Sequence, residues 1–203
     1  QKRLTNDIAY IRIKHFTQKT AEEMLSALKV ASETKAKGLV LDLRNNPGGL
    51  LDASVAVADY FLDGGEIVSI RGRVEKANEV FTAKPGTAFD GPVAVLINEG
   101  SASASEIVAG ALKDRERAVL VGEKSFGKGS VQTLFRLPDG SGLFVTIAKY
   151  YTPSGVMIDG VGVEPDIVVE GKYTGKLDDD EQLKRATEEV EALLVKVPAK
   201  VAK

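Results

Sequence analysis

An apolar run, a turn rich in glycine or serine, and a stretch with apolar residues at helical spacing follow one another twice in this sequence. The first set occupies residues 38–43, 44–49 and 50–62, and the second occupies residues 93–98, 99–101 and 102–112. Nearly continuous apolar strands that alternate with helices are typical of a parallel sheet covered on both faces. The sequence therefore predicts an α/β domain, with its functional groups where strands end and helices begin.

Further strands and helices are expected around these two units. Periodicity predicts strands at 8–14, 67–74, 79–83 and 118–121, a helix at 17–34, and an added hairpin of residues 131–137 and 143–151. After Glu170 the composition becomes acidic before a final amphipathic pattern. We therefore divide the chain into a core over residues 1–170 and, over 171–203, an acidic linker with a C-terminal helix that docks on the core or a partner chain.

Composition excludes several classes of protein. The 203 residues include no cysteine and one histidine, which excludes a disulfide-stabilised miniprotein and a thiolate metal site. A net charge of −2 provides no overall field for nucleic acid. No apolar stretch reaches the roughly 18–20 residues that cross a bilayer. The polar N-terminus lacks an apolar signal core, so we expect that any export signal was removed or never present.

The first cluster with chemical potential is Gly-Ser-Ala-Ser-Ala-Ser-Glu at residues 100–106, on a turn from strand to helix. Unpaired backbone N–H groups and the positive end of the helix dipole meet there, and together they can form an oxyanion hole beside a serine. Ser103 and Glu106 also fit a capping box, in which the serine only caps the helix. The residues alone leave both interpretations open.

The second cluster is Gly-Glu-Lys-Ser-Phe-Gly-Lys-Gly-Ser at residues 122–130, which nearly matches a phosphate-binding loop. Gly129 occupies the position of the magnesium-binding hydroxyl, and a strand rather than a helix follows, so nucleotide binding is disfavoured. Lys128 lies between two glycines and can approach other backbone closely. A lysine that serves as a general base needs its pKa lowered from about 10.4 to about 7–8, which demands a dry pocket. Lys124, beside Glu123 in a polar stretch, is a weaker candidate.

The third cluster, Leu-Asp-Leu-Arg-Asn-Asn-Pro-Gly-Gly at residues 41–49, ends a strand with two glycines before a helix. The glycine pair makes a tight turn or brings a second backbone N–H to an oxyanion. His15 could complete a Ser-His-Asp triad, but the sequence has no Gly-x-Ser-x-Gly elbow. We therefore interpret His15 as a structural residue at the end of a strand.

Together, the three clusters resemble the carboxyl-terminal processing peptidases, also called tail-specific proteases, from about residue 8 to 170. The resemblance implies a ClpP/crotonase-like core and a serine endopeptidase that cuts polypeptides near their C-termini and needs no cofactor or metal. It identifies Ser103 as the nucleophile, Lys128 as the general base and Gln132 as the residue that orients the lysine. The oxyanion hole would use the N–H of Ala104 and that of Gly48 or Gly49.

The resemblance also implies a location in the cell envelope, in the bacterial periplasm, and substrates that are C-terminal segments of polypeptides, with an oligomer or a regulatory partner as further possibilities. Family members commonly carry an N-terminal helical region and a PDZ module. This sequence starts near the first core strand, so we expect a shortened chain or a core-only relative. A regular strand would separate Lys128 and Gln132 by about 13 Å, so the chain near Gly129 has to bend. The alternatives are a non-catalytic interaction module and a crotonase-like acyl-transfer enzyme that binds coenzyme A thioesters.

Overall fold

The computed structural model describes residues 2–4, 7–73, 75–171, 173, 175, 177 and 179–196. Its main sheet has six strands in the order β1-β2-β3-β6-β7-β10. Their bounds are β1 Lys2–Arg3, β2 Ile8–Arg12, β3 Gly38–Asp42, β6 Val93–Ile97, β7 Val119–Gly122 and β10 Ile167–Val168. All neighbours pair in parallel except β1, which is antiparallel to β2. The predicted α/β class with a ClpP-like core is confirmed.

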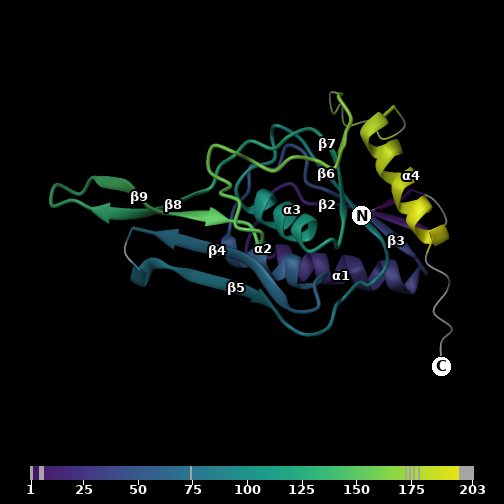
Figure 1. Ribbon diagram of the computed structural model, residues 1–203, viewed down its shortest axis with the longest axis horizontal. Coiled ribbons are helices and arrows are strands. Elements are labelled where there is room, and N and C mark those ends of the chain that lie inside the picture. Colours follow the sequence, from purple (N-terminus) through teal and green to yellow (C-terminus); the bar gives the residue numbers. More distant parts are fainter. Residues whose placement is uncertain are drawn as a thin grey trace.

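Four helices cover this sheet (Figure 1). They are α1 Thr20–Glu33, α2 Leu51–Asp59, α3 Ala104–Asp114 and α4 Glu181–Lys196. Side chains alternate between the two faces of each strand, so Leu39 and Leu41 pack with α1, α2 and α3, whereas Val40 packs with α4. Since both faces are covered, the central strands β3 and β6 are buried along their whole length.

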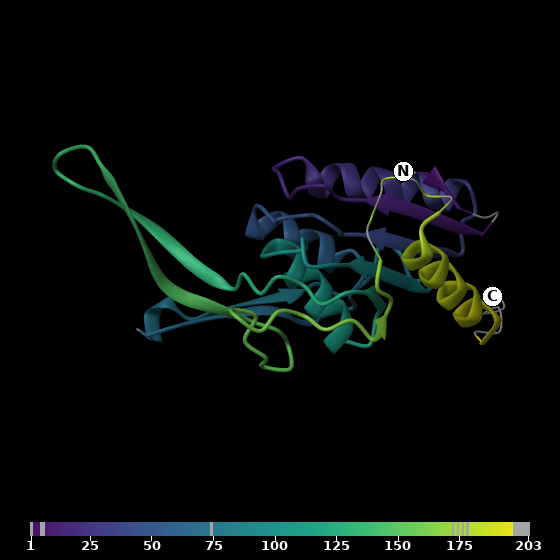
Figure 2. The same cartoon turned by 90° about the horizontal axis from the view of Figure 1, so that it is seen from above.

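A second, antiparallel sheet lies against α2 and α3 on the side away from the main sheet (Figure 1). Its order is β5-β4-β9-β8, with bounds β4 Gly65–Gly72, β5 Glu79–Ala83, β8 Ser130–Arg136 and β9 Gly142–Tyr151, and a short 3-10 helix η1, Glu75–Ala77, follows β4. The predicted hairpin is confirmed as β8 and β9, and Figure 2 shows that it extends away from the rest of the molecule.

The carboxyl ends of the central strands meet at one edge of the main sheet. Asp42, the last residue of β3, lies opposite Arg12 of β2 and Leu96 of β6. The loops that leave β3 and β6 therefore start side by side, and both lead directly into helices. Within the described part of the chain, no helix is long and apolar enough to cross a membrane.

Candidate functional site

Ser103 lies between β6 and α3, directly before the helix. Its backbone has φ 56° and ψ −114°, whereas a residue in the N-cap position normally has extended backbone. A non-glycine residue held in such a conformation costs on the order of 1–3 kcal/mol and is found mostly at functional sites. The predicted capping box with Glu106 is present, but capping does not require this strain. The backbone of Ser103 therefore favours a functional role in addition to capping.

The three serines of this turn have different environments. Ser101 and Ser105 are completely buried. The hydroxyl of Ser101 donates to the carbonyl oxygen of Leu43 at 2.8 Å, and that of Ser105 donates to the carbonyl oxygen of Asn46 at 2.9 Å. Ser103 is partly exposed. Of the three, only Ser103 can meet a large ligand without first breaking a buried hydrogen bond.

Glu106 joins the serine turn to the lysine loop. Its carboxylate is completely buried. Oε2 accepts the N–H groups of Ser103 at 2.7 Å and Lys128 at 2.9 Å, while Oε1 accepts the Ser125 hydroxyl and the Gly127 N–H, both at 2.6 Å. One side chain thus fixes two loops that lie more than twenty positions apart in the sequence. The capping-box pattern identified the bond to Ser103, but no sequence signal pointed to the other three.

Asn46 also joins separate segments of the chain, on the other side of the serine turn. Its amide donates to the carbonyl oxygen of Ile13 at 2.9 Å and accepts the Gly48 N–H at 2.9 Å. Its own carbonyl oxygen accepts the Ala102 N–H and the Ser105 hydroxyl, both at 2.9 Å. This residue was not singled out from the sequence, because its partners lie on separate segments. It fixes the glycine loop against the turn that carries Ser103.

The two glycines allow the backbone of this loop to approach Ser103. A Cβ atom on Gly48 would lie 2.7 Å from Ser103 Cβ and 2.9 Å from the Ala104 nitrogen, and a Cβ on Gly49 would lie 2.1 Å from the carbonyl oxygen of Phe16. Their φ angles, 102° and 140°, are in the region that favours glycine. A side chain at Gly48 would push the loop away from the serine turn, and one at Gly49 would push it away from Phe16.

Two backbone N–H groups near Ser103 have no acceptor among the described residues. They belong to Ala104, the first residue of α3, and to Gly49. The N–H of Gly48 is already bonded to Asn46. An unpaired N–H in the first turn of a helix, with the helix dipole behind it, is suited to an anionic oxygen. Of the two glycines, Gly49 is therefore the better candidate for the second donor.

Lys128 reaches this site through its backbone, and its side chain is exposed. This exposure differs from the dry pocket that a neutral amine would need. Gly129 is held by its N–H, which donates to Asp159 Oδ1 at 3.2 Å. The backbone of Lys128 is thus positioned next to the serine turn, while the residue as a whole is exposed.

No hydrogen bond joins Gln132 to Lys128 among the described residues. It is exposed on β8, and its amide donates to the hydroxyl of Thr146 across the hairpin at 3.4 Å. The pairing of β8 with β9 shifts register between Val131 and Gln132. The shift leaves Ile147 of β9 as the extra residue, so the bulge lies on β9 and the alternation of side chains along β8 is unchanged.

The two other candidates from the sequence, His15 and Lys124, make contacts that do not involve the serine turn. His15 is exposed at the end of the first core strand, and its carbonyl oxygen accepts the Thr20 hydroxyl at 3.2 Å. Lys124 forms a surface ion pair with Glu164 at 2.7 Å. Across the part of the chain that the structure describes, no three histidine or acidic side chains are grouped as a metal site would require.

Comparison with known proteins assigns these features to a family. The model of peptidase family S41 matches residues 7–169. The carboxy-terminal-processing protease of Bartonella bacilliformis is 55% identical over 184 residues, which cover 85% of this chain and 42% of that protein. The carboxyl-terminal-processing protease of a Synechocystis species is 50% identical over 163 residues, which cover 80% and 38% of the two chains.

Solved structures agree with this assignment. The photosystem II D1 C-terminal processing protease superposes with a TM-score of 0.78 at 40% identity, over 88% of this chain and 46% of that one. The tricorn protease, at a TM-score of 0.57 and 20% identity, shares the fold. The chain spans less than half the length of these relatives. With a family model that matches most of its length, this chain belongs to peptidase family S41, the group to which its serine, lysine and glycine clusters pointed.

Proposed function

We propose that this chain is the catalytic core of a serine endopeptidase that cuts polypeptides near their C-termini. The observation that carries the proposal is the strained, partly exposed Ser103 directly before α3, together with the N–H groups of Ala104 and Gly49, which have no acceptor among the described residues. Membership of family S41 and the names of the related processing proteases support the same reaction. The corresponding location is the bacterial cell envelope, and the substrates are C-terminal segments of other proteins.

In the proposed reaction, the Ser103 hydroxyl attacks the carbonyl carbon of the scissile peptide bond while Lys128 accepts its proton. The N–H groups of Ala104 and Gly49 stabilise the negative charge that develops on the carbonyl oxygen. Lys128 then donates a proton to the departing amine, which leaves an ester between Ser103 and the substrate. A water molecule hydrolyses this ester and restores the serine.

The lysine requires cover that the free chain does not supply. A neutral amine is favoured by removal from water, and the Lys128 side chain is exposed. We propose that a bound polypeptide covers it and that Gln132 exchanges its long bond with Thr146 for one to the lysine. This proposal is supported by the shared Glu106 oxygen, which keeps the backbone of Lys128 next to that of Ser103 before substrate arrives.

Covalent labelling tests the proposed nucleophile. We expect a fluorophosphonate probe to modify the chain once, and peptide mapping by mass spectrometry to locate the adduct on Ser103. Casein added before the probe should be cleaved and should slow the labelling. Labelling of Ser101 or Ser105 instead would contradict the assignment.

The two alternative functions give different results in the same assay. A non-catalytic module would retain casein without cleaving it and would not react with the probe. An acyl-transfer enzyme would show a rise in melting temperature with coenzyme A thioesters. Either result, with intact casein, would replace the proteolytic function.

Replacing Glu106 with alanine should reduce both stability and activity, because four donors lose their acceptor at once. Each buried unpaired donor costs about 1–3 kcal/mol, so we expect a loss of about 3–5 kcal/mol in unfolding free energy after partial relaxation. We also expect cleavage to fall by about 10- to 100-fold, because misplacement of a catalytic group by about 1 Å has an effect of that order. Denaturant titration and initial rates measure the two losses.

Glu164→Ala is the matched control for the Glu106 variant. Glu164 is an exposed glutamate whose ion pair with Lys124 lies at the surface, and such pairs contribute about 0–1 kcal/mol. Its replacement should leave both measurements nearly unchanged. If Glu106→Ala behaved like this control, the carboxylate would not be holding the two loops together.

A further inference from the structure

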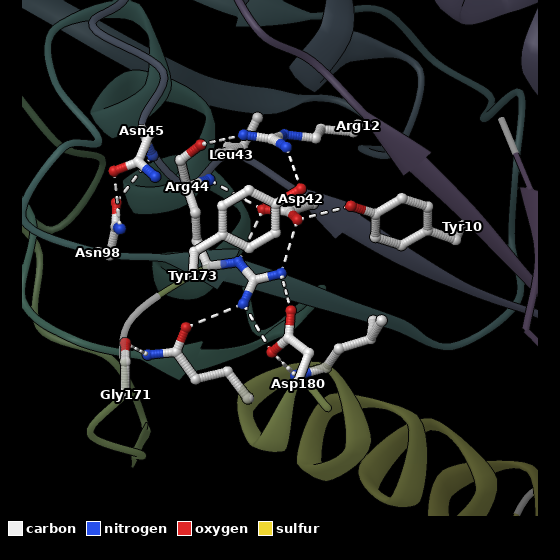
Figure 3. Close-up of polar contacts among 12 residues, drawn as sticks. Tyr10, Arg12, Asp42, Leu43, Arg44, Asn45, Asn98, Gly171, Tyr173 and Asp180 are labelled. Carbon is white, nitrogen blue, oxygen red and sulfur yellow. Dashed lines mark hydrogen bonds and ion pairs between the residues drawn. The ribbon is translucent and has the colours of Figure 1, made fainter. Parts of the chain in front are cut away.

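Arg44, the second residue after β3, is completely buried and is held by the C-terminal segment of the chain (Figure 3). Its Nε and Nη2 donate to the two carboxylate oxygens of Asp42 at 3.0 and 2.8 Å. Its Nη1 donates to Asp180 Oδ1 at 2.9 Å and to Gln182 Oε1 at 3.0 Å. Asp180 directly precedes α4, so the helix that covers one face of the sheet is tied to the carboxyl edge of the same sheet.

The charges of this cluster are balanced by two acidic and two basic side chains. Burial alone lowers the pKa of Arg44, but its bonds to Asp42 and Asp180 outweigh this effect and raise the pKa overall. Burial and the neighbouring Asp42 raise the pKa of Tyr10, whose hydroxyl donates to Asp42 at 2.7 Å. The planes of Arg12 and Arg44 both lie over the ring of Tyr173. Removal of one carboxylate would leave the buried Arg44 with only one of its two acidic partners, which is costly.

The contacts of Arg44 continue along the backbone to the candidate active site. The N–H of Arg44 donates to Asp42 Oδ1 at 2.9 Å, so side chain and backbone are fixed to the same carboxylate. The next residue, Asn45, has φ 55°, and its N–H and side chain bond to Asn98 at 2.8 and 3.0 Å, on the turn that leads to Ser103 (Figure 3). Gly48 lies only four residues after Arg44. A continuous series of contacts thus leads from Asp180 through Arg44 to the start of the glycine loop.

We propose that Asp180 is a positioning residue: through Arg44, the C-terminal segment holds the 45–49 loop in the register that the reaction requires. The part of this inference that concerns the cleavage rate rests on the proposed proteolytic function. The part that concerns the position of the 45–49 loop does not, because the contacts from Asp180 to Arg44 and along the loop are present without any substrate. Movement of α4, by a partner or by another part of the protein, would then change the rate at Ser103 without contact with the substrate.

The test distinguishes the bond between Asp180 and Arg44 from the helix cap that Asp180 also forms. Asp180 Oδ1 accepts the Leu183 N–H at 2.9 Å, which caps α4. Asp180→Ser keeps a good capping residue but is too short to reach Arg44, and Asp180→Asn keeps one oxygen for Arg44 without the charge. Val190→Ala is the matched control, because Val190 is a buried residue of α4 that packs against the sheet and is not a partner of Arg44.

We expect amide hydrogen exchange in residues 44–50 to be at least about tenfold faster in Asp180→Ser than in Val190→Ala, when the two variants are compared under conditions that give them the same free energy of unfolding. The exchange rate in Asp180→Asn should lie between the two. With casein-derived peptides, kcat should fall about tenfold in Asp180→Ser while KM changes less than about twofold. Equal exchange in the serine variant and the Val190 control would overturn the proposal. If the wild-type chain does not cleave, the proposed function fails, and the exchange data still decide whether Asp180 holds the loop.

Discussion

Replacing Ser103 with alanine should reduce peptide cleavage by at least about a thousandfold, because removal of the nucleophile leaves only binding and oxyanion stabilisation to assist water. The substituted residue loses one oxygen atom, and the backbone bond from its N–H to Glu106 stays. The melting temperature should therefore change by no more than a few degrees. Release of a fluorogenic C-terminal peptide, followed over hours to detect the residual rate, measures the effect.

Ser105→Ala provides the control within the same turn. The Ser105 hydroxyl donates to the Asn46 carbonyl oxygen in a buried position, so its loss should cost about 1 kcal/mol of stability and leave most of the cleavage rate. This pair of variants distinguishes a chemical role from a structural one. Full activity in the Ser103 variant, or complete loss in the Ser105 variant alone, would move the nucleophile to a different residue.

Much of the fold was predictable, because each central element has a strong local pattern. The apolar runs at 38–43 and 93–98 became β3 and β6, and the two stripes that follow them became α2 and α3. The two-residue strands β1 and β10 were not predicted. Segments this short have no measurable periodicity, and they become strands only because the edges of an existing sheet offer backbone partners.

The three site clusters were found from the sequence, but what fixes them relative to one another was not. Asn46 and Glu106 each bind two or more segments that are remote in the chain. Hydrogen bonds over such distances leave no periodic signal. The same holds for the C-terminal part, which the sequence separated from the core at residue 170. Asp180 and Gln182 bond to Arg44 in the core, and no sequence pattern indicated these bonds.

The environment of Lys128 was the main difference between expectation and structure. A buried amine was expected, and the side chain is exposed. The same two glycines explain both the close backbone approach and the missing cover, since a residue without a side chain permits contact but shields nothing. If Lys128 is the base, as proposed, its burial has to come from the substrate. In that case catalysis depends on how much of the peptide covers the lysine, and short substrates should lose kcat as well as affinity.

Replacing Lys128 with alanine should lower cleavage by at least about a thousandfold, a loss similar to that of Ser103→Ala, because a nucleophile and its base act as one unit. Lys128→Arg should be equally inactive, because arginine keeps the charge but does not accept a proton at working pH. Lys124→Ala is the matched control. It removes an exposed lysine four positions earlier whose partner is the surface residue Glu164, and it should cleave at nearly the wild-type rate. The double variant Ser103→Ala/Lys128→Ala should be no slower than either single variant, whereas additive losses would show that the two residues act independently and would refute the dyad.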